Sequence, residues 1–323
     1  MRLILMSMLL IVLINGCSEV PEPPLRLGIS AWLGNDPFIL ARDLDLLKAP
    51  RVRVVELSSI AETKRNLRNG ELEAASLTLD EALRLVEEGV ALQIVGVLSL
   101  SDGADGIIAK PSIQTLQDLQ GKRLALEDGA VGRLLLRGML MVGGYSLSDL
   151  HLQYMDAPLH EKALRSGQVD AVITYEPMRS RLLADGYNEL FSSGWMPGEL
   201  VDVLVVRNDL SPRRRQSLVD LLVGWEQGLE YLNKHTDAAV ELLVRGSELT
   251  PQEYLTAFNG IYFHNLSDSV SLLQGDDPGL AQASRLLVSI LIEQQMLSET
   301  PDWSLLLDDQ YARQAQLKRG EVR

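Results

Sequence analysis

Two segments of the chain repeat each other without a gap, at an offset of 97 residues. Residues 67–89 read LRNGELEAASLTLDEALRLVEEG, and residues 164–186 read LRSGQVDAVITYEPMRSRLLADG. Each copy has the pattern of a helix end, a glycine, a strand, a short loop and a second helix. The repeat predicts two similar lobes, and a chance similarity between two units of the same secondary structure is the alternative. With two lobes, residues 78–80 and 175–177 would follow equivalent strands and face each other across a cleft.

Short strands and helices alternate along the chain before residue 210. The expected strands are residues 25–30, 51–57, 72–77, 91–98, 122–126 and 169–175. The expected helices are residues 37–47, 59–69, 80–88 and 131–142. This alternation predicts an α/β fold in which each lobe is a mostly parallel sheet flanked by helices. Beyond residue 210 the pattern becomes helical, with helix starts at Ser211-Pro212 and Thr250-Pro251.

The N-terminus has the pattern of a secretion signal. Met1-Arg2 carries a positive charge, and the apolar run at 3–14 is shorter than the roughly 20 residues that span a bilayer. The run ends in Ile14-Asn15-Gly16-Cys17, which resembles a bacterial lipobox. That resemblance implies a signal peptide at 1–16, lipidation of Cys17 and a proline-rich tether at 17–24. An ordinary signal peptide followed by an incidental cysteine is the alternative, although Cys17 is the only cysteine of the chain.

The charge balance of the chain is acidic. It holds 30 basic and 44 acidic residues, and the net charge is −14. That balance argues against nucleic acid and against an anionic membrane surface as partners. The sequence also lacks the common hydrolase, zinc-protease and phosphate-loop motifs, and its four histidines are scattered. We therefore expect no enzymatic activity, no cofactor and no metal.

Several stretches of the chain carry a resemblance to a known family. They are residues 101–110 (SDGADGIIAK), 116–135 (LQDLQGKRLALEDGAVGRLL), 168–178 (QVDAVITYEPM) and 200–209 (LVDVLVVRND). Together they resemble the periplasmic binding proteins of the nitrate, taurine and alkanesulfonate type, which also include binders of thiamine precursors. The likeness covers roughly residues 25–210, and the segment at 44–48 departs from it by running almost directly into the second strand.

The resemblance implies a hinged, two-lobed fold that closes on a small ligand. Lobe one would hold residues 25–105 and 206–323, and lobe two would hold residues 106–205. The chain would cross between the lobes near Gly106–Ala109 and again near Val203–Val206. The implied role is that of a lipid-anchored, extracytoplasmic substrate-binding protein that delivers its ligand to the permease of an ABC-type importer. A sensing subunit for a membrane receptor and an enzyme related to thiamine-pyrimidine formation are the alternatives.

The candidate ligand site consists of loops that follow predicted strands. Its residues are Trp32, Asp36, Thr78, Asp80, Ser99, Asp102, Gly129, Ala130, Val131, Tyr175, Glu176 and Asp202. These loops hold several carboxylates and no basic side chain, so an anion would be repelled there. The expected ligand is therefore a cationic amine or a neutral, nitrogen-rich heterocycle. The helix that begins near Ala130 is the counter-argument, because the free N–H groups of a helix start can bind an anion without a basic side chain.

Overall fold

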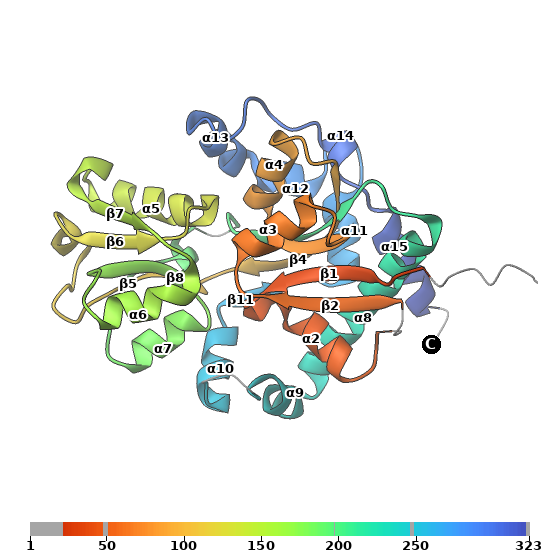
Figure 1. Ribbon diagram of the computed structural model, residues 1–323, viewed down its shortest axis with the longest axis horizontal. Helices are drawn as coiled ribbons and strands as arrows, with labels where there is room; N and C mark the ends of the chain where they lie inside the picture. The colour runs from red at the N-terminus through yellow and green to blue at the C-terminus, as the bar shows by residue number, and fades with distance from the viewer. Residues whose placement is uncertain (1–21, 48–50, 197, 246–248, 321–323) are drawn as a thin grey trace, which may run out of the picture.

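The molecule consists of two lobes, each built on one β-sheet (Figure 1). The computed structural model describes residues 22–320, apart from 48–50, 197 and 246–248. The predicted signal peptide and Cys17 lie outside the described residues. The two-lobed α/β fold predicted from the sequence is confirmed, including the helical character of the chain after residue 210.

The first lobe is built on a six-stranded sheet with the order β11-β4-β10-β3-β1-β2. Its strands are β1 (Leu25–Ser30), β2 (Val52–Leu57), β3 (Ala74–Thr78), β4 (Leu92–Ser101), β10 (Val201–Arg207) and β11 (Ile261–Phe263). Helices α2 (Asp36–Asp43), α3 (Ile60–Arg68) and α4 (Leu79–Glu87) alternate with the first strands. β1 runs parallel to β2 and β3, whereas β10 is antiparallel to both of its neighbours. The apolar residues of β1 are fully buried because the sheet is covered on both faces.

The second lobe is built on a five-stranded sheet with the order β7-β6-β8-β5-β9. Its strands are β5 (Asp105–Ala109), β6 (Arg123–Leu126), β7 (His151–Tyr154), β8 (Ala171–Tyr175) and β9 (Asn188–Ser192). Its helices are α5 (Ala130–Gly143), α6 (His160–Arg165) and α7 (Met178–Ala184). β6 is parallel to β7 and β8, whereas β5 is antiparallel to β8 and β9. In both sheets the first strands pair in parallel, whereas β5 and β10, which directly follow the passages between the lobes, pair antiparallel with their neighbours.

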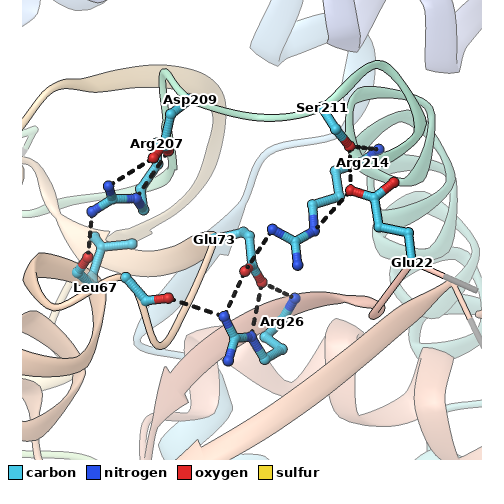
Figure 2. Close-up of polar contacts among 9 residues, drawn as sticks. Glu22, Arg26, Leu67, Glu73, Arg207, Asp209, Ser211 and Arg214 are labelled. Atoms are coloured by element: carbon cyan, nitrogen blue, oxygen red, sulfur yellow. Dashed lines mark hydrogen bonds and ion pairs between the residues drawn. The ribbon is translucent and has the colours of Figure 1, made fainter. Parts of the chain in front are cut away.

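The internal repeat is present in the hydrogen bonds of the two lobes. Arg26 donates to the carboxylate of Glu73 and to the carbonyl of a glycine three residues before it (Figure 2). Arg123 makes the same set of bonds with Asp170, at the offset of 97 residues. The pairing of β1 with β3 and of β6 with β8 also has the same register at this offset. The repeat predicted from the sequence is therefore confirmed, and it extends back to the first strand of each lobe.

The two passages between the lobes are held together by one buried serine. The chain leaves the first lobe between β4 and β5, and it returns between β9 and β10. The hydroxyl of Ser193 lies 2.8 Å from that of Ser101 and accepts a hydrogen bond from the N–H of Gly103 at 2.8 Å. The passages predicted near Gly106–Ala109 and near Val203–Val206 are both wrong. The whole of β5 lies in the second sheet, where it pairs with β8 and β9. The whole of β10 lies in the first sheet, because its buried apolar residues pair with β3 on one side and β4 on the other.

The C-terminal helices cover the first lobe and reach the second. They are α8 (Pro212–Lys234), α9 (Thr236–Leu243), α10 (Pro251–Phe258), α11 (Leu266–Leu273), α12 (Gly279–Ala283), α13 (Arg285–Glu293), α14 (Trp303–Leu306) and α15 (Gln310–Gly320). On α8, Trp225 is buried against Phe38 of α2, with ring centroids 4.7 Å apart. α13 contacts α4 of the first lobe and α5 of the second (Figure 1). Within the described residues, none of the helices combines the length and the apolar character needed to span a bilayer.

Candidate functional site: a cavity between the lobes

A cavity lies between the two lobes, where β1, β3 and β8 end. The volume of the cavity itself is about 70 Å³, and the empty space including the open solvent at its mouth is about 800 Å³. Much of its wall is apolar, and the aliphatic residues that line it are Ile60, Leu77, Val131, Leu135, Ile173 and Leu200. The rings of Trp32 and Tyr175 meet edge to face across the cavity, with centroids 5.9 Å apart. Because these two rings belong to different lobes, the structure shows the lobes in contact around the cavity.

Equivalent positions of the repeat line the cavity from both sides. Seven pairs of lining residues are related by the offset of 97 residues. They are Ser30 with Glu127, Trp32 with Gly129, Asn35 with Gly132, Ser76 with Ile173, Leu77 with Thr174, Thr78 with Tyr175, and Asp105 with Asp202. The two lobes thus present equivalent positions to the cavity, and in every pair except Asp105 with Asp202 they carry different side chains there. The lining residues that remain come mainly from the hinge region and from the helix starts, for example Ser101, Leu200, Glu81 and Val131.

A hydrogen-bonded group at the floor of the cavity centres on Asp202. The indole Nε1 of Trp32 donates to Asp202 Oδ2 at 2.8 Å, and the hydroxyl of Ser99 donates to the same atom at 2.5 Å. Among the described residues, none donates to Asp202 Oδ1, which leaves that oxygen for a ligand. Gly34 makes this arrangement possible, because an added Cβ would lie 2.0 Å from Trp32 Nε1 and 2.7 Å from Ser99 Oγ.

Three buried carboxyl groups of the cavity have raised pKa values. Burial raises the pKa of Asp202 to about 6, against the hydrogen bonds from Ser99 and Trp32. Burial raises the pKa of Asp105 to about 7, and the nearby charge of Asp202 adds to the effect. Burial also raises the pKa of Glu127 to about 7, against the hydrogen bond that its carboxylate accepts from the N–H of Ala157 at 3.1 Å. Each group would gain from a cationic or N–H-donating partner in the cavity.

The cavity offers hydrogen-bond acceptors and lacks basic side chains. Among the residues that the structure describes, neither lysine nor arginine lines it. The amide of Asn35 donates from Nδ2 to the carbonyl of Ser30 at 3.0 Å, so its Oδ1 is left as a buried acceptor without a described partner. A buried polar atom of this kind costs free energy unless a ligand or water satisfies it. The polar part of the site is therefore suited to a ligand that donates hydrogen bonds.

Glu81 brings a fourth carboxylate to the cavity, and this one reaches the start of α5 in the other lobe. Its side chain is buried and pairs with Lys64, while Arg84 lies 3.7 Å away. A Cβ atom added to Gly129, the N-cap of α5, would lie 2.7 Å from Glu81 Oε1. The helix start that could have held an anionic ligand is thus in contact with a carboxylate of the protein itself.

Half of the twelve predicted ligand residues line the cavity. They are Trp32, Thr78, Gly129, Val131, Tyr175 and Asp202. Ser99 does not line the cavity, but its hydroxyl donates a hydrogen bond to the carboxylate of Asp202, which does. Ala130 is the first residue of α5, next to the lining residues Gly129 and Val131.

Four predicted acidic residues do not line the cavity. Asp36 is buried elsewhere and accepts a hydrogen bond from the hydroxyl of Tyr254. Asp80 is buried in the first turn of α4, one position before the carboxylate that does reach the cavity. Asp102 is exposed in the passage between β4 and β5. Glu176 is fully buried, and its carboxylate is already taken up by contacts within the second lobe.

The contacts of Glu176 are specific. Its Oε1 accepts from Arg179 Nη1 at 2.8 Å and from the hydroxyl of Ser180 at 2.9 Å, and its Oε2 accepts from the N–H of Ser180 at 3.0 Å. The prediction that Glu176 faces a ligand is therefore wrong. Glu176 does follow a strand that ends at the cavity, but its side chain bonds to Arg179 and Ser180 of α7 instead of reaching the cavity.

Several lining residues were not selected from the sequence. The polar ones are Ser30, Asn35, Ser76, Glu81, Ser101, Asp105, Glu127 and Thr174. The repeat held a signal for Asp105, because its partner at the offset of 97 residues is the predicted ligand residue Asp202. The same offset links Ser30 with Glu127, but neither of these two residues was predicted, so the repeat gave no starting point for them.

A cavity enclosed between two hinged α/β lobes is the architecture of substrate-binding proteins. The sequence model of the NMT1-like family matches residues 18–243, and the chain belongs to this family. The expected likeness to the nitrate, taurine and alkanesulfonate type is thereby confirmed. A Brucella abortus protein named as a binding protein is 24% identical over 168 residues. That match covers 51% of this chain and 52% of the Brucella protein, so the chain spans about half the length of this relative.

Solved structures share the fold at low sequence identity. The alkanesulfonate-binding protein SsuA from Xanthomonas axonopodis pv. citri, bound to MOPS, has a TM-score of 0.71 and 19% identity. The likeness covers 87% of this chain and 96% of that protein. The desulfurization enzyme DszB has a TM-score of 0.65 and 16% identity over 91% of this chain and 99% of its own. The fold therefore occurs both in a binding protein and in an enzyme. The side chains that line the cavity must show whether binding or catalysis is favoured.

Proposed function

We propose that the protein is the extracytoplasmic substrate-binding component of an ABC-type importer and that its ligand is a small nitrogen-containing solute. The observation that carries this proposal is the cavity between the lobes, where buried carboxyl groups face apolar walls and none of the described lining residues is basic. Closure of the lobes around the ligand would remove it from water, as in other hinged binding proteins. The released ligand would then pass to a membrane permease.

The chemistry of the cavity supports a cationic amine or a neutral heterocycle that donates hydrogen bonds. Asp202 Oδ1 and Asn35 Oδ1 are acceptors without a described donor. The aromatic edges of Trp32 and Tyr175 and the aliphatic wall suit an apolar or ring portion of such a ligand. A sulfonate or nitrate would instead meet Asp105, Glu127 and Asp202 in a region of low dielectric constant, where like charges repel strongly.

The proposal favours binding over catalysis. Among the described residues, none of the histidines lines the cavity, and no group of histidine, cysteine or acidic residues is arranged to hold a metal ion. The described lining residues also include neither a cysteine nor a lysine as a nucleophile. They include serines and threonines, but no histidine or lysine that could act as a base for these hydroxyls. Binding with closure is the activity that these side chains support best.

Ligand binding is expected to weaken at acid pH. At pH 5, Asp202, with a pKa of about 6, and Asp105 and Glu127, with pKa values of about 7, are mostly protonated in the free protein. A cationic ligand must then displace their protons, so its affinity should fall by about tenfold or more between pH 8 and pH 5. Titration calorimetry at the two pH values measures this directly. Equal or tighter binding of the cation at pH 5 would contradict the proposed role of these carboxylates.

The raised pKa values of Asp105, Glu127 and Asp202 also determine how the stability of the ligand-free protein changes with pH. Because their folded-state pKa values lie above those of the unfolded chain, the folded protein binds more protons between about pH 4 and pH 7. Their contribution to stability is therefore present at low pH and is lost as the pH rises through 6 to 7. A cationic ligand should accordingly raise the melting temperature more at pH 8 than at pH 5.

Membrane attachment through Cys17 is part of the proposal. Replacing Cys17 with Ala is expected to release the protein from the membrane fraction, because a lipid anchor requires the thiol. The replacement of Ser18 with Ala, one position further on, serves as the matched control and should leave the protein with the membranes. Fractionation followed by a carbonate wash checks both variants. A Cys17→Ala variant that stays in the washed membranes would rule out the lipid anchor.

A further inference from the structure

Helix α5 begins at the cavity without a cap of its own. Its N-cap is Gly129, no side chain forms a cap hydrogen bond, and its first turn contains no acidic residue. A helix start of this kind leaves backbone N–H groups and a partial positive charge without a partner from the same segment. With 14 residues, α5 is among the longer helices of the molecule, and its start points to the boundary between the lobes.

The carboxylate of Glu81 approaches this helix start from the opposite lobe. It comes from the first turn of α4, and its side chain is 2% exposed. Its Oε2 pairs with Lys64 of α3, and its Oε1 is the atom that a Cβ on Gly129 would meet at 2.7 Å. One carboxylate therefore lies between the basic group of one lobe and the helix start of the other.

We propose that Glu81 determines the charge selectivity of the cavity by occupying, from the first lobe, the position that an anionic ligand would take at the start of α5. The inference rests on the proposed function, because it treats the cavity as the ligand site. Glu81 acts in two ways. It places a negative charge beside Gly129, the N-cap of α5, and it neutralises Lys64 of α3. Both effects leave the cavity with acceptors and without a place for an anion.

The experiment tests whether removing the charge of Glu81 allows the cavity to bind an anion. In Glu81→Gln the shape is kept, while Lys64 and the start of α5 lose their carboxylate. The variant is expected to bind methanesulfonate at least about tenfold more tightly than the wild type, because charge-assisted donors then face the anion. Calorimetry in a sulfonate-free buffer measures the two affinities. The same change at Glu88, an exposed residue at the end of α4 that pairs with Arg68, is the matched control and should produce no gain.

Two further variants make the result decisive. Adding Lys64→Met to Glu81→Gln should abolish most of the gain, because the freed ammonium is then absent. Glu81→Asp keeps the charge but withdraws the carboxylate by one methylene, so its methanesulfonate affinity should lie between those of the wild type and Glu81→Gln. This variant also provides a test if Glu81→Gln does not fold. An unchanged methanesulfonate affinity in the folded variants would overturn the inference.

The outcome can be separated from that of the proposed function. Titration of the wild type with amines tests whether the cavity takes a cationic ligand at all. A gain of methanesulfonate binding in Glu81→Gln would support the role of Glu81 even if the wild type bound no amine. Methanesulfonate binding by the wild type as tight as that of the variant would refute the role of Glu81.

Discussion

Replacing Asp202 with Asn is expected to weaken the binding of a cationic ligand by about 30-fold to 1,000-fold at pH 8. Asp202 is buried at the cavity floor, and Trp32 and Ser99 hold its Oδ2 while Oδ1 is left for the ligand. Asn has the same shape and can still accept a hydrogen bond, so the change removes the charge and little else. Breaking one side of a buried charge pair leaves the other charge desolvated, which explains the size of the effect.

Calorimetry with the amine that binds the wild type most tightly measures this loss. Asp102→Asn is the matched control, because it makes the same chemical change on an exposed residue near the passage between the lobes. Its effect on affinity should be within about 0.5 kcal/mol. An Asp202→Asn variant that binds the amine as tightly as the wild type would remove Asp202 from the ligand site.

Replacing Glu176 with Gln is expected to lower the stability of the protein by about 3 kcal/mol, with little direct effect on the ligand. The carboxylate of Glu176 is fully buried and accepts three hydrogen bonds from Arg179 and Ser180. Gln cannot satisfy all three donors, and its amide nitrogen would face either the guanidinium or the backbone N–H. Equilibrium unfolding in urea measures the loss, which corresponds to a fall in melting temperature of roughly 5–10 °C.

The surface pair of Asp185 with Arg165 provides the comparison for Glu176. Both of its side chains are partly exposed, so Asp185→Asn should cost less than about 1 kcal/mol. Amine affinity measured on the folded Glu176→Gln variant separates structure from binding. A large loss of affinity together with unchanged stability would show that Glu176 contacts the ligand after all.

The strands and helices could be predicted from the sequence because their apolar patterns and end signals are local. The strand predicted at 169–175 is β8, and the helix predicted at 59–69 is α3, whose cap Ser59 accepts from the N–H of Glu62 at 3.2 Å. One helix end was predicted in the wrong place. The helix expected at 37–47 ends at Asp43, and Asp45 has a φ of 55°, a left-handed conformation that the sequence pattern did not indicate.

The ligand site was only partly predictable, because the direction of a side chain after a strand depends on the element that follows. Asp80 and Glu81 are neighbours in the first turn of α4, yet Glu81 lines the cavity and Asp80 does not. A rotation of about 100° per residue along a helix separates them, and a sequence does not show which of the two faces the other lobe. Of the residues predicted after strand ends, Trp32 and Tyr175 line the cavity, whereas Asp36 and Glu176 do not.

A comparison of ligand classes on the purified wild-type protein tests the central claim most directly. Thermal-shift measurements at pH 8, in a buffer free of sulfonates, would compare amines, aminopyrimidines, alkanesulfonates and nitrate, and calorimetry would follow each positive result. The account predicts that one or more amines or aminopyrimidines raise the melting temperature, whereas methanesulfonate and nitrate leave it unchanged. Tight binding of a sulfonate or nitrate by the wild type, with no response to any nitrogen-containing cation or heterocycle, would contradict it.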